Sequence, residues 1–248
     1  TLELGGADGF RLAIQQIGLE KKQKNETRVL LPADGLKPFV ALLKGLTGNV
    51  EFVYDAAAHC VYWTLPDFTL VQQICVGTYP NYKLLVPDVK KLHWQVKLVR
   101  ADLSGTLKAV AGKAATTSGI TRLVASPKGL EVSAGIASEG GVVSTAIPAQ
   151  ILKRGRGLIR TALHLPYLDG AVRAIATDEL TLSWDSPSTP VVFQPVGQSG
   201  FKVVVMPMFV QWPDSPKPNP KDLRVAEQEA AETPAPVVAQ SESAEAVA

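Results

Sequence analysis

Short runs of alternating apolar and polar residues fill most of the chain and predict a protein built mainly from β-strands. Such runs, separated by Gly, Pro, Asn or Asp, occur at residues 10–17, 50–54, 60–65, 68–76, 129–136, 140–147, 180–184, 190–196 and 201–207. Three other segments, 36–46, 103–115 and 167–175, repeat their apolar residues every three or four positions. Each of these predicts an amphipathic helix, so the pattern as a whole indicates an α+β protein.

Two stretches of the chain share one order of elements and indicate an internal repeat. The stretches from Val29 to Trp63 and from Ala162 to Phe193 each run strand, Leu-Pro, Asp-Gly, helix, strand, turn, strand. Their prolines, Pro32 and Pro166, are 134 residues apart, which is about the length of one domain. The sequence therefore predicts a repeated α+β unit, the first copy of which lacks its front half.

The residue types that carry chemistry do not form a catalytic or metal-binding pattern. Cys60, Cys75 and the three histidines are scattered, and no HExxH, GxSxG, Walker or GxGxxG motif is present, so neither enzyme activity nor a cofactor is expected. Two unpaired cysteines, no apolar run of membrane-spanning length and no signal-peptide pattern favour a cytoplasmic protein. Because Thr1 is not a methionine, we expect a fragment or a processed product.

Charge is distributed unevenly along the chain. Residues 1–213 contain 22 basic and 16 acidic residues, a net charge of +6, whereas residues 214–248 contain three basic and seven acidic residues, a net charge of −4. A basic body favours an anionic partner such as nucleic acid, although an ordinary solvated surface explains the charge equally well. Residues 213–248 are rich in Pro, Ala, Glu and Ser and lack aromatic residues, which predicts a disordered tail.

Three short motifs, in order along the chain, resemble those of the bacterial sliding clamp, the β subunit of DNA polymerase III. They are ADGFRLA at 7–13, GTYPNYKLLVP at 77–87 and VVMPM at 204–208. The resemblance covers about residues 1–212. It implies the back half of the family's second domain at 1–88 and its third domain at 89–212, before the acidic tail at 213–248. The implied fold is an α+β DNA clamp with antiparallel sheets outside and short helices lining a ring.

The resemblance also implies a function in DNA replication without catalysis. In sliding clamps, two head-to-tail subunits form a homodimeric ring around duplex DNA, without sequence-specific contacts. DNA polymerase, the clamp loader and repair proteins dock on this ring through short peptides. This implies a processivity factor in the cytoplasm, associated with the nucleoid. The alternative is a truncated, clamp-like peptide-binding module that does not encircle DNA, and an enzyme of unknown type is a third class without site residues to support it.

The resemblance assigns a peptide-binding pocket, an apolar groove that accepts Leu and Phe side chains. By motif it comprises Gly9, Phe10, Arg11, Leu12, Pro80, Leu84, Leu85, Val204, Val205, Met206, Pro207 and Met208, and by looser alignment His164, Tyr167, Pro187 and Thr189. Phe10 stands where the family usually has His or Tyr, and Leu84 stands where many clamps have Arg, which makes the pocket more apolar. Without the motif, core filling is the simpler explanation of Met206 and Met208.

Five cations on the predicted helices are the candidates to face DNA: Lys37, Lys44, Lys108, Lys113 and Arg173. Long cations on helices that line a hole attract phosphates without fixing a register, which suits a clamp that must slide. A solvated helix face explains each of these residues equally well. The densest basic cluster, at residues 153–157, is expected to be only a solvated turn.

Overall fold

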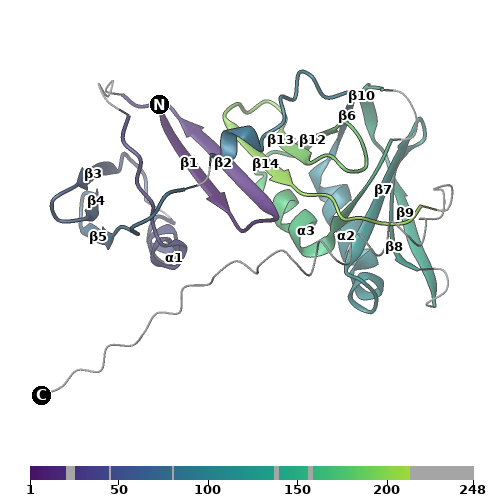
Figure 1. Cartoon of the computed structure of the whole chain (residues 1–248), viewed down its shortest axis with the longest axis horizontal. Helices are drawn as coiled ribbons and strands as arrows, with labels where there is room; N and C mark the ends of the chain where they lie inside the picture. Colours follow the sequence, from purple (N-terminus) through teal and green to yellow (C-terminus); the bar gives the residue numbers. More distant parts are fainter. Residues whose placement is uncertain (21–25, 45, 80, 137–139, 156–158, 213–248) are drawn as a thin grey trace, which may run out of the picture. The chain divides into compact units, whose positions relative to one another are not determined.

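Antiparallel sheets and short α-helices form the part of the chain that the structure describes, in agreement with the apolar pattern (Figure 1). The computed structural model describes residues 1–20, 26–44, 46–79, 81–136, 140–155 and 159–212. The predictions for Pro80, for part of the basic cluster at 153–157 and for the tail from residue 213 on fall outside these ranges. No helix within them is long and apolar enough to cross a membrane.

The largest sheet has seven strands in the order β1-β2-β14-β13-β12-β6-β10, and every neighbouring pair is antiparallel. Its strands are β1 (Leu2–Ala7), β2 (Arg11–Ile17), β6 (Trp94–Val99), β10 (Gln150–Lys153), β12 (Glu179–Trp184), β13 (Val191–Pro195) and β14 (Phe201–Val205). A second sheet has the order β11-β7-β8-β9, with β7 (Ile120–Ser126), β8 (Gly129–Ile136), β9 (Gly141–Ile147) and β11 (Ile159–His164).

Two helices, α2 (Arg100–Ala115) and α3 (Leu165–Ala174), pack against each other and against both of these sheets. Their buried residues, among them Leu107 on α2 and Leu168 on α3, join one core with Trp184 and Phe193 of the large sheet and Leu123 of the small one. Full burial of a side chain of this size stabilises the fold by about 1.5–3 kcal/mol relative to exposure. This shared core therefore holds α2, α3 and the strands of both sheets in fixed positions relative to one another.

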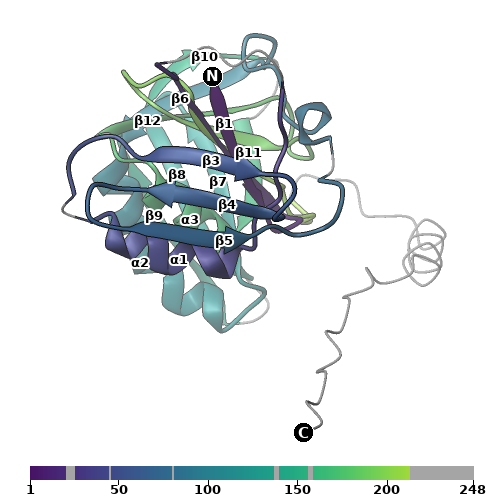
Figure 2. The ribbon, with the colours of Figure 1, turned by 90° about the vertical axis from the view of Figure 1, so that its left-hand side faces the viewer.

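A smaller sheet of β3 (Glu51–Asp55), β4 (Cys60–Thr64) and β5 (Thr69–Gln73) is packed with α1 (Ala33–Leu42) (Figure 2). Alternate residues of β4 point to one face, and there Val61 and Trp63 form a separate core with Phe39 of α1. The rings of Phe39 and Trp63 are 4.9 Å apart between centroids. This module therefore has an apolar centre of its own.

The helix and the strands after it that the internal repeat predicts are confirmed, and this part of the order occurs three times. Each of α1, α2 and α3 is followed by a three-stranded meander: β3-β4-β5, β7-β8-β9 and β12-β13-β14. The two larger units exchange their leading strands, because β6 precedes α2 but pairs with β12, while β11 precedes α3 but pairs with β7. The strand predicted before Pro32 is not formed, although Cys75 N donates to Leu30 O at 2.7 Å.

The first helix begins and ends earlier than the apolar pattern predicts. It starts at Ala33, directly after Pro32, and ends at Leu42 instead of Leu46. Beyond Leu42 the chain tightens into three-residue turns, in which Lys44 N donates to Ala41 O at 3.3 Å and Leu46 N donates to Leu43 O at 3.2 Å. An apolar residue in such a turn keeps its spacing without belonging to the helix.

By the density of contacts, residues Thr1–Met208 form one unit and Phe209–Ala248 a second. Of the second unit the structure describes Phe209–Trp212, which form neither helix nor strand. The predicted boundary between residues 88 and 89 stays a prediction.

Candidate functional site

Two motifs that are almost 200 residues apart in sequence meet at one end of the seven-stranded sheet. Strand β14 pairs with β2 along its whole length, as far as Val205 opposite Arg11. The backbone N–H of Met206 then donates to the carbonyl of Phe10 at 2.8 Å, and that of Met208 to the carbonyl of Ala162 at 2.7 Å. The ADGFRLA and VVMPM segments are therefore in direct contact.

The turn between β1 and β2 is built by Asp8 and Gly9. The Asp8 carboxylate accepts hydrogen bonds from the backbone N–H groups of Phe10 and Arg11, and Gly9 has a φ of +86°, which glycine adopts at no steric cost. The Arg11 Nε donates to the same carboxylate at 2.8 Å. Burial alone would raise the pKa of Asp8, but the hydrogen bonds from Arg11 and from the Phe10 backbone outweigh it, so the pKa is lowered.

Aromatic rings connect this turn to the start of α3. The ring of Phe10 stacks on that of Tyr167 with centroids 5.3 Å apart and planes 14° apart. The Arg11 guanidinium also lies 5.3 Å from the centre of the Tyr167 ring, and His164 packs against the same ring at 4.8 Å. The structure thus brings together four of the predicted pocket residues.

The opposite face of the same strands is covered by the linker at residues 77–93, which leads to β6. Leu12 and Val204 are buried there beneath Tyr82 and Val86. Further along the linker's single turn of 3-10 helix (η1, Tyr82–Leu84), Leu84 is 82% exposed, and Leu85 after it is 63% exposed. Large exposed apolar side chains next to a packed core are typical of a surface that binds a partner.

The remaining predicted pocket residues fall into different surroundings. Met206 and Gly9 are exposed, while Pro207 and Met208 are half-buried. Val205 is fully buried in the main core, because alternate residues of a strand face opposite sides. Its side chain therefore supports the site from behind and does not line it.

Pro187 and Thr189 lie on the turn between β12 and β13. Pro187 is exposed, whereas the Thr189 hydroxyl is occupied within the turn: it accepts from the backbone N–H groups of Asp185 and Ser186 and donates to the Ser186 carbonyl. Thr189 therefore shapes this turn through its hydroxyl, while the ring of Pro187 is left exposed.

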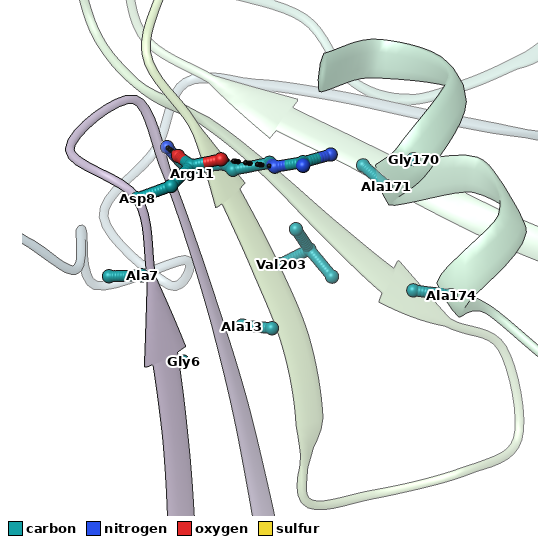
Figure 3. A pocket seen from close by; sticks show the side chains of 9 residues that line it. All are labelled: Gly6, Ala7, Asp8, Arg11, Ala13, Gly170, Ala171, Ala174 and Val203. Atoms are coloured by element: carbon teal, nitrogen blue, oxygen red, sulfur yellow. Dashed lines mark hydrogen bonds and ion pairs between the residues drawn. The ribbon is translucent and has the colours of Figure 1, made fainter. Parts of the chain in front are cut away.

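Arg11 and His164 line two separate hollows. The first, of about 270 Å³, lies between the β1–β2 hairpin and α3 and is mostly apolar, with lining residues Gly6, Ala7, Asp8, Arg11, Ala13, Gly170, Ala171, Ala174 and Val203 (Figure 3). A Cβ at Gly170 would stand 2.3 Å from the Arg11 Nη1 atom, so a larger residue at this position of α3 would displace the end of the Arg11 side chain. The second, of about 380 Å³, joins His164 to the end of α2.

Of the predicted DNA-facing cations, three are engaged within the chain. Lys37 pairs with Asp34 at 2.6 Å, Arg173 pairs with Asp169 at 2.8 Å, and the Lys113 ammonium donates to the carbonyl of Gly140 at 2.9 Å. Lys108 is exposed on α2 and Lys44 is exposed beyond the end of α1. Exposed pairs like the first two contribute little to stability and are screened by salt.

One polar contact at this site was not predicted from the sequence. The Tyr82 hydroxyl hydrogen-bonds the carboxylate of Glu3, on β1. The bond joins residues 79 positions apart, and neither an apolar period nor a local turn signal indicates such a pair. Tyr82 lies inside the GTYPNYKLLVP segment but was not among the predicted pocket residues.

The comparisons with known proteins agree with this arrangement. Over 211 residues the chain is 25% identical to the beta sliding clamp of Synechococcus elongatus, and over 230 residues it is 22% identical to that of Synechocystis; each match covers 84% of this chain. The DNA polymerase III beta subunit of Thermotoga maritima superposes with a TM-score of 0.74 at 21% identity, over 84% of this chain and 55% of that one. The chain has the sliding-clamp fold.

A sliding clamp from Bacillus subtilis superposes equally well, with a TM-score of 0.74 at 16% identity, over 84% of this chain and 54% of that one. No family model matches the chain. The chain spans about half the length of the curated relatives it matches, 54% and 55%. The clamp fold therefore extends through most of this chain, while the activity of a whole clamp is a matter for proposal.

Proposed function

We propose that this chain is part of a sliding clamp, a DNA polymerase processivity factor that encircles duplex DNA and binds replication and repair proteins through short peptides. One observation carries the proposal: all three clamp-like motifs meet at one end of one sheet. Phe10 bonds to Met206 through the backbone, and Tyr82 packs over Leu12 and Val204 on the opposite face of the same strands. This is the convergence that a peptide-binding site assembled from distant segments requires.

The exposed side chains at this place fit an apolar peptide. Phe10 is 51% and Met206 43% exposed, and Leu84 and Leu85 on the linker are still more open. A peptide with two adjacent apolar anchors that buries a few hundred Å² gains several kcal/mol at about 25 cal/mol per Å², before the cost of ordering it. Micromolar affinity is the consequence, and it suits a hub whose partners must exchange.

Titration of a labelled peptide containing adjacent Leu and Phe, with the same peptide carrying Ala at both positions as a control, tests the site. Met206→Ala is expected to weaken binding by about 1–2 kcal/mol, because it removes contact area while the backbone stays in place. Lys108→Ala, at an exposed position of α2, should leave the affinity unchanged. Equal weakening by both variants would place the site on the wrong face.

The sheet edges support ring formation. β14, the third strand of its repeat unit, pairs antiparallel with β2, while β9 and β5 occupy the same position in their units and lie at the edges of their sheets among the described residues. β9 contains no charged residue and exposes Val142 and Val143. An uncharged, apolar edge is suited to pairing with another strand, so we assign β9 and β5 to further joints of the ring.

The alternative, a clamp-like peptide-binding module that does not encircle DNA, is favoured by the three cations that are already engaged within the chain. The two functions differ in how they respond to DNA topology. A ring stays on closed circular duplex at high salt and is lost when the circle is cut, because it slides off the ends. Equal retention on circular and linear DNA, with peptide binding intact, would support the module.

A further inference from the structure

The linker at residues 77–93 is fixed to strand β1 by a small polar cluster around Glu3. Besides the Tyr82 hydroxyl, the Glu3 carboxylate accepts a hydrogen bond from Gln16 Nε2 at 2.7 Å, and Lys83 Nζ lies 3.8 Å from it. Glu3 and Gln16 face each other across the β1–β2 ladder. Both carboxylate oxygens are therefore used, one by the sheet and one by the linker.

The Tyr82 ring lies over Gly5 of β1, at ordinary van der Waals distance from a Cβ placed there. A Cβ at Gly5 would come within 3.9 Å of two ring atoms. The ring also packs on the buried cluster of Leu12 and Val204, and it meets Tyr79 edge-on at 5.8 Å. Tyr82 therefore combines apolar packing with a polar contact at its tip, as tyrosines at interfaces do.

Titration states agree with a phenol that donates to a carboxylate. The hydrogen bonds from Gln16 and Tyr82 lower the pKa of Glu3. The hydrogen bond to Glu3, with a smaller effect from burial, raises the pKa of Tyr82 to about 12. At neutral pH the donor keeps its proton and the acceptor keeps its charge, which makes the hydrogen bond a charge-assisted one.

The exposed Leu84 and Leu85 lie in the same turn as Tyr82, whose hydroxyl is bonded to Glu3. Leu85 N donates to the carbonyl of Tyr82 at 2.9 Å and Leu84 N to that of Asn81 at 3.2 Å, so both belong to the turn that Tyr82 begins. Because their side chains point mostly into solvent, they contribute little packing that would hold the turn in place. A ligand binds exposed side chains more tightly when another contact has already ordered them, because binding then does not have to offset the entropy cost of ordering them.

We propose that the Tyr82–Glu3 hydrogen bond is the positioning contact that holds Leu84 and Leu85 ready for a ligand of this site. The inference rests on the proposed peptide-binding function, and it adds a residue pair that acts through its neighbours. Tyr82 is thus a positioning residue, because its hydroxyl is bonded to Glu3 of β1 and acts on the two leucines through the turn.

The chain offers a matched control for the test. Tyr82→Phe deletes the anchoring hydroxyl and keeps the ring. Tyr79→Phe deletes a hydroxyl three residues earlier in the same linker; that group is buried and has no hydrogen-bond partner among the described residues. We expect Tyr82→Phe to speed hydrogen exchange at the Leu84 and Leu85 amides and to weaken binding of the Leu/Phe peptide about five- to tenfold.

Tyr79→Phe is expected to leave exchange and affinity unchanged. A double variant, Glu3→Ala with Tyr82→Phe, should bind the peptide no more weakly than Glu3→Ala alone, because the two groups act as one contact. Unchanged exchange in Tyr82→Phe, or equal effects of both tyrosine variants, would overturn the inference. If the wild type does not bind the peptide, the proposed function fails, and exchange at the two leucine amides still decides whether Tyr82 anchors the linker.

Discussion

Replacing Tyr167 with leucine is expected to release the β1–β2 turn from α3. The ring of Tyr167 is contacted by both Phe10 and Arg11, the two residues that follow the turn. A stacked aromatic pair contributes about 0.5–1.5 kcal/mol beyond area burial, and an exposed cation–π contact about 0.5–1 kcal/mol. Because Phe10 is half exposed and Arg11 is also paired with Asp8, we expect a loss of about 1–2 kcal/mol in the free energy of unfolding.

Leucine is the suitable replacement because Tyr167 also packs against the main core, and an aliphatic side chain keeps much of that contact. Tyr167→Phe is the matched control, since it retains the ring that both neighbours use. Urea denaturation followed by tryptophan fluorescence measures the global loss. Hydrogen exchange at the Met206 amide, which donates to Phe10, measures the local release of the turn.

The expected order of stability is wild type and Tyr167→Phe together, with Tyr167→Leu below them, and faster exchange at Met206 only in the leucine variant. Loss of the same free energy in both variants would show that the hydroxyl, and not the stacked ring, stabilises the turn. A leucine variant with wild-type stability and exchange would show that the aromatic contacts contribute nothing measurable.

Three further outcomes can be measured on the same chain. Gly129→Ala should reduce the free energy of unfolding by more than about 2 kcal/mol and so lower the melting temperature, because φ is +130° and the new Cβ would stand 2.2 Å from a carbonyl oxygen at the end of β9. Gly112→Ala, on an open face of α2, should instead stabilise the fold by up to about 1 kcal/mol. In a spectrophotometric titration Tyr82 should ionise near pH 12; since its folded pKa is raised, the stability it contributes is complete below its ordinary pKa of about 10 and is lost as the pH rises from there toward 12. Lys108→Ala should reduce the salt slope of duplex DNA binding by about 0.9, whereas Lys113→Ala should not, because its ammonium already bonds to a backbone carbonyl.

The elements that the sequence predicts best are those with a clean period and glycine at their ends. The predicted strand at 129–136 has the same bounds as β8, where a glycine starts the strand and buried and exposed residues largely alternate. Strands β1, β6, β7 and β10 were not predicted. β1 contains two adjacent glycines and β10 has only four residues, so both are held by their neighbours in the sheet more than by their own propensity.

The site was predictable only as a set of segments. The motifs placed Phe10, Leu84 and Met206 in one region, but they did not say which side chains would be open. The two-residue period of β14 puts Val204 under the linker and Val205 in the main core, which depends on which face of the strand the linker covers. The Tyr82–Glu3 contact depends on a fold that brings residues 79 positions apart together, and no local pattern encodes it.

The exchange of leading strands between the α2 and α3 units has a consequence for how the protein folds. The β6–β12 ladder pairs Val99 with Glu179, 80 residues apart, and the β11–β7 ladder pairs Ile159 with Ala125, 34 residues apart. Neither sheet is complete until the other unit delivers its leading strand, so an intermediate with only one unit folded would leave a sheet edge open. Long loops must close before these pairs form, which makes folding slow and unfolding of this region a single cooperative event.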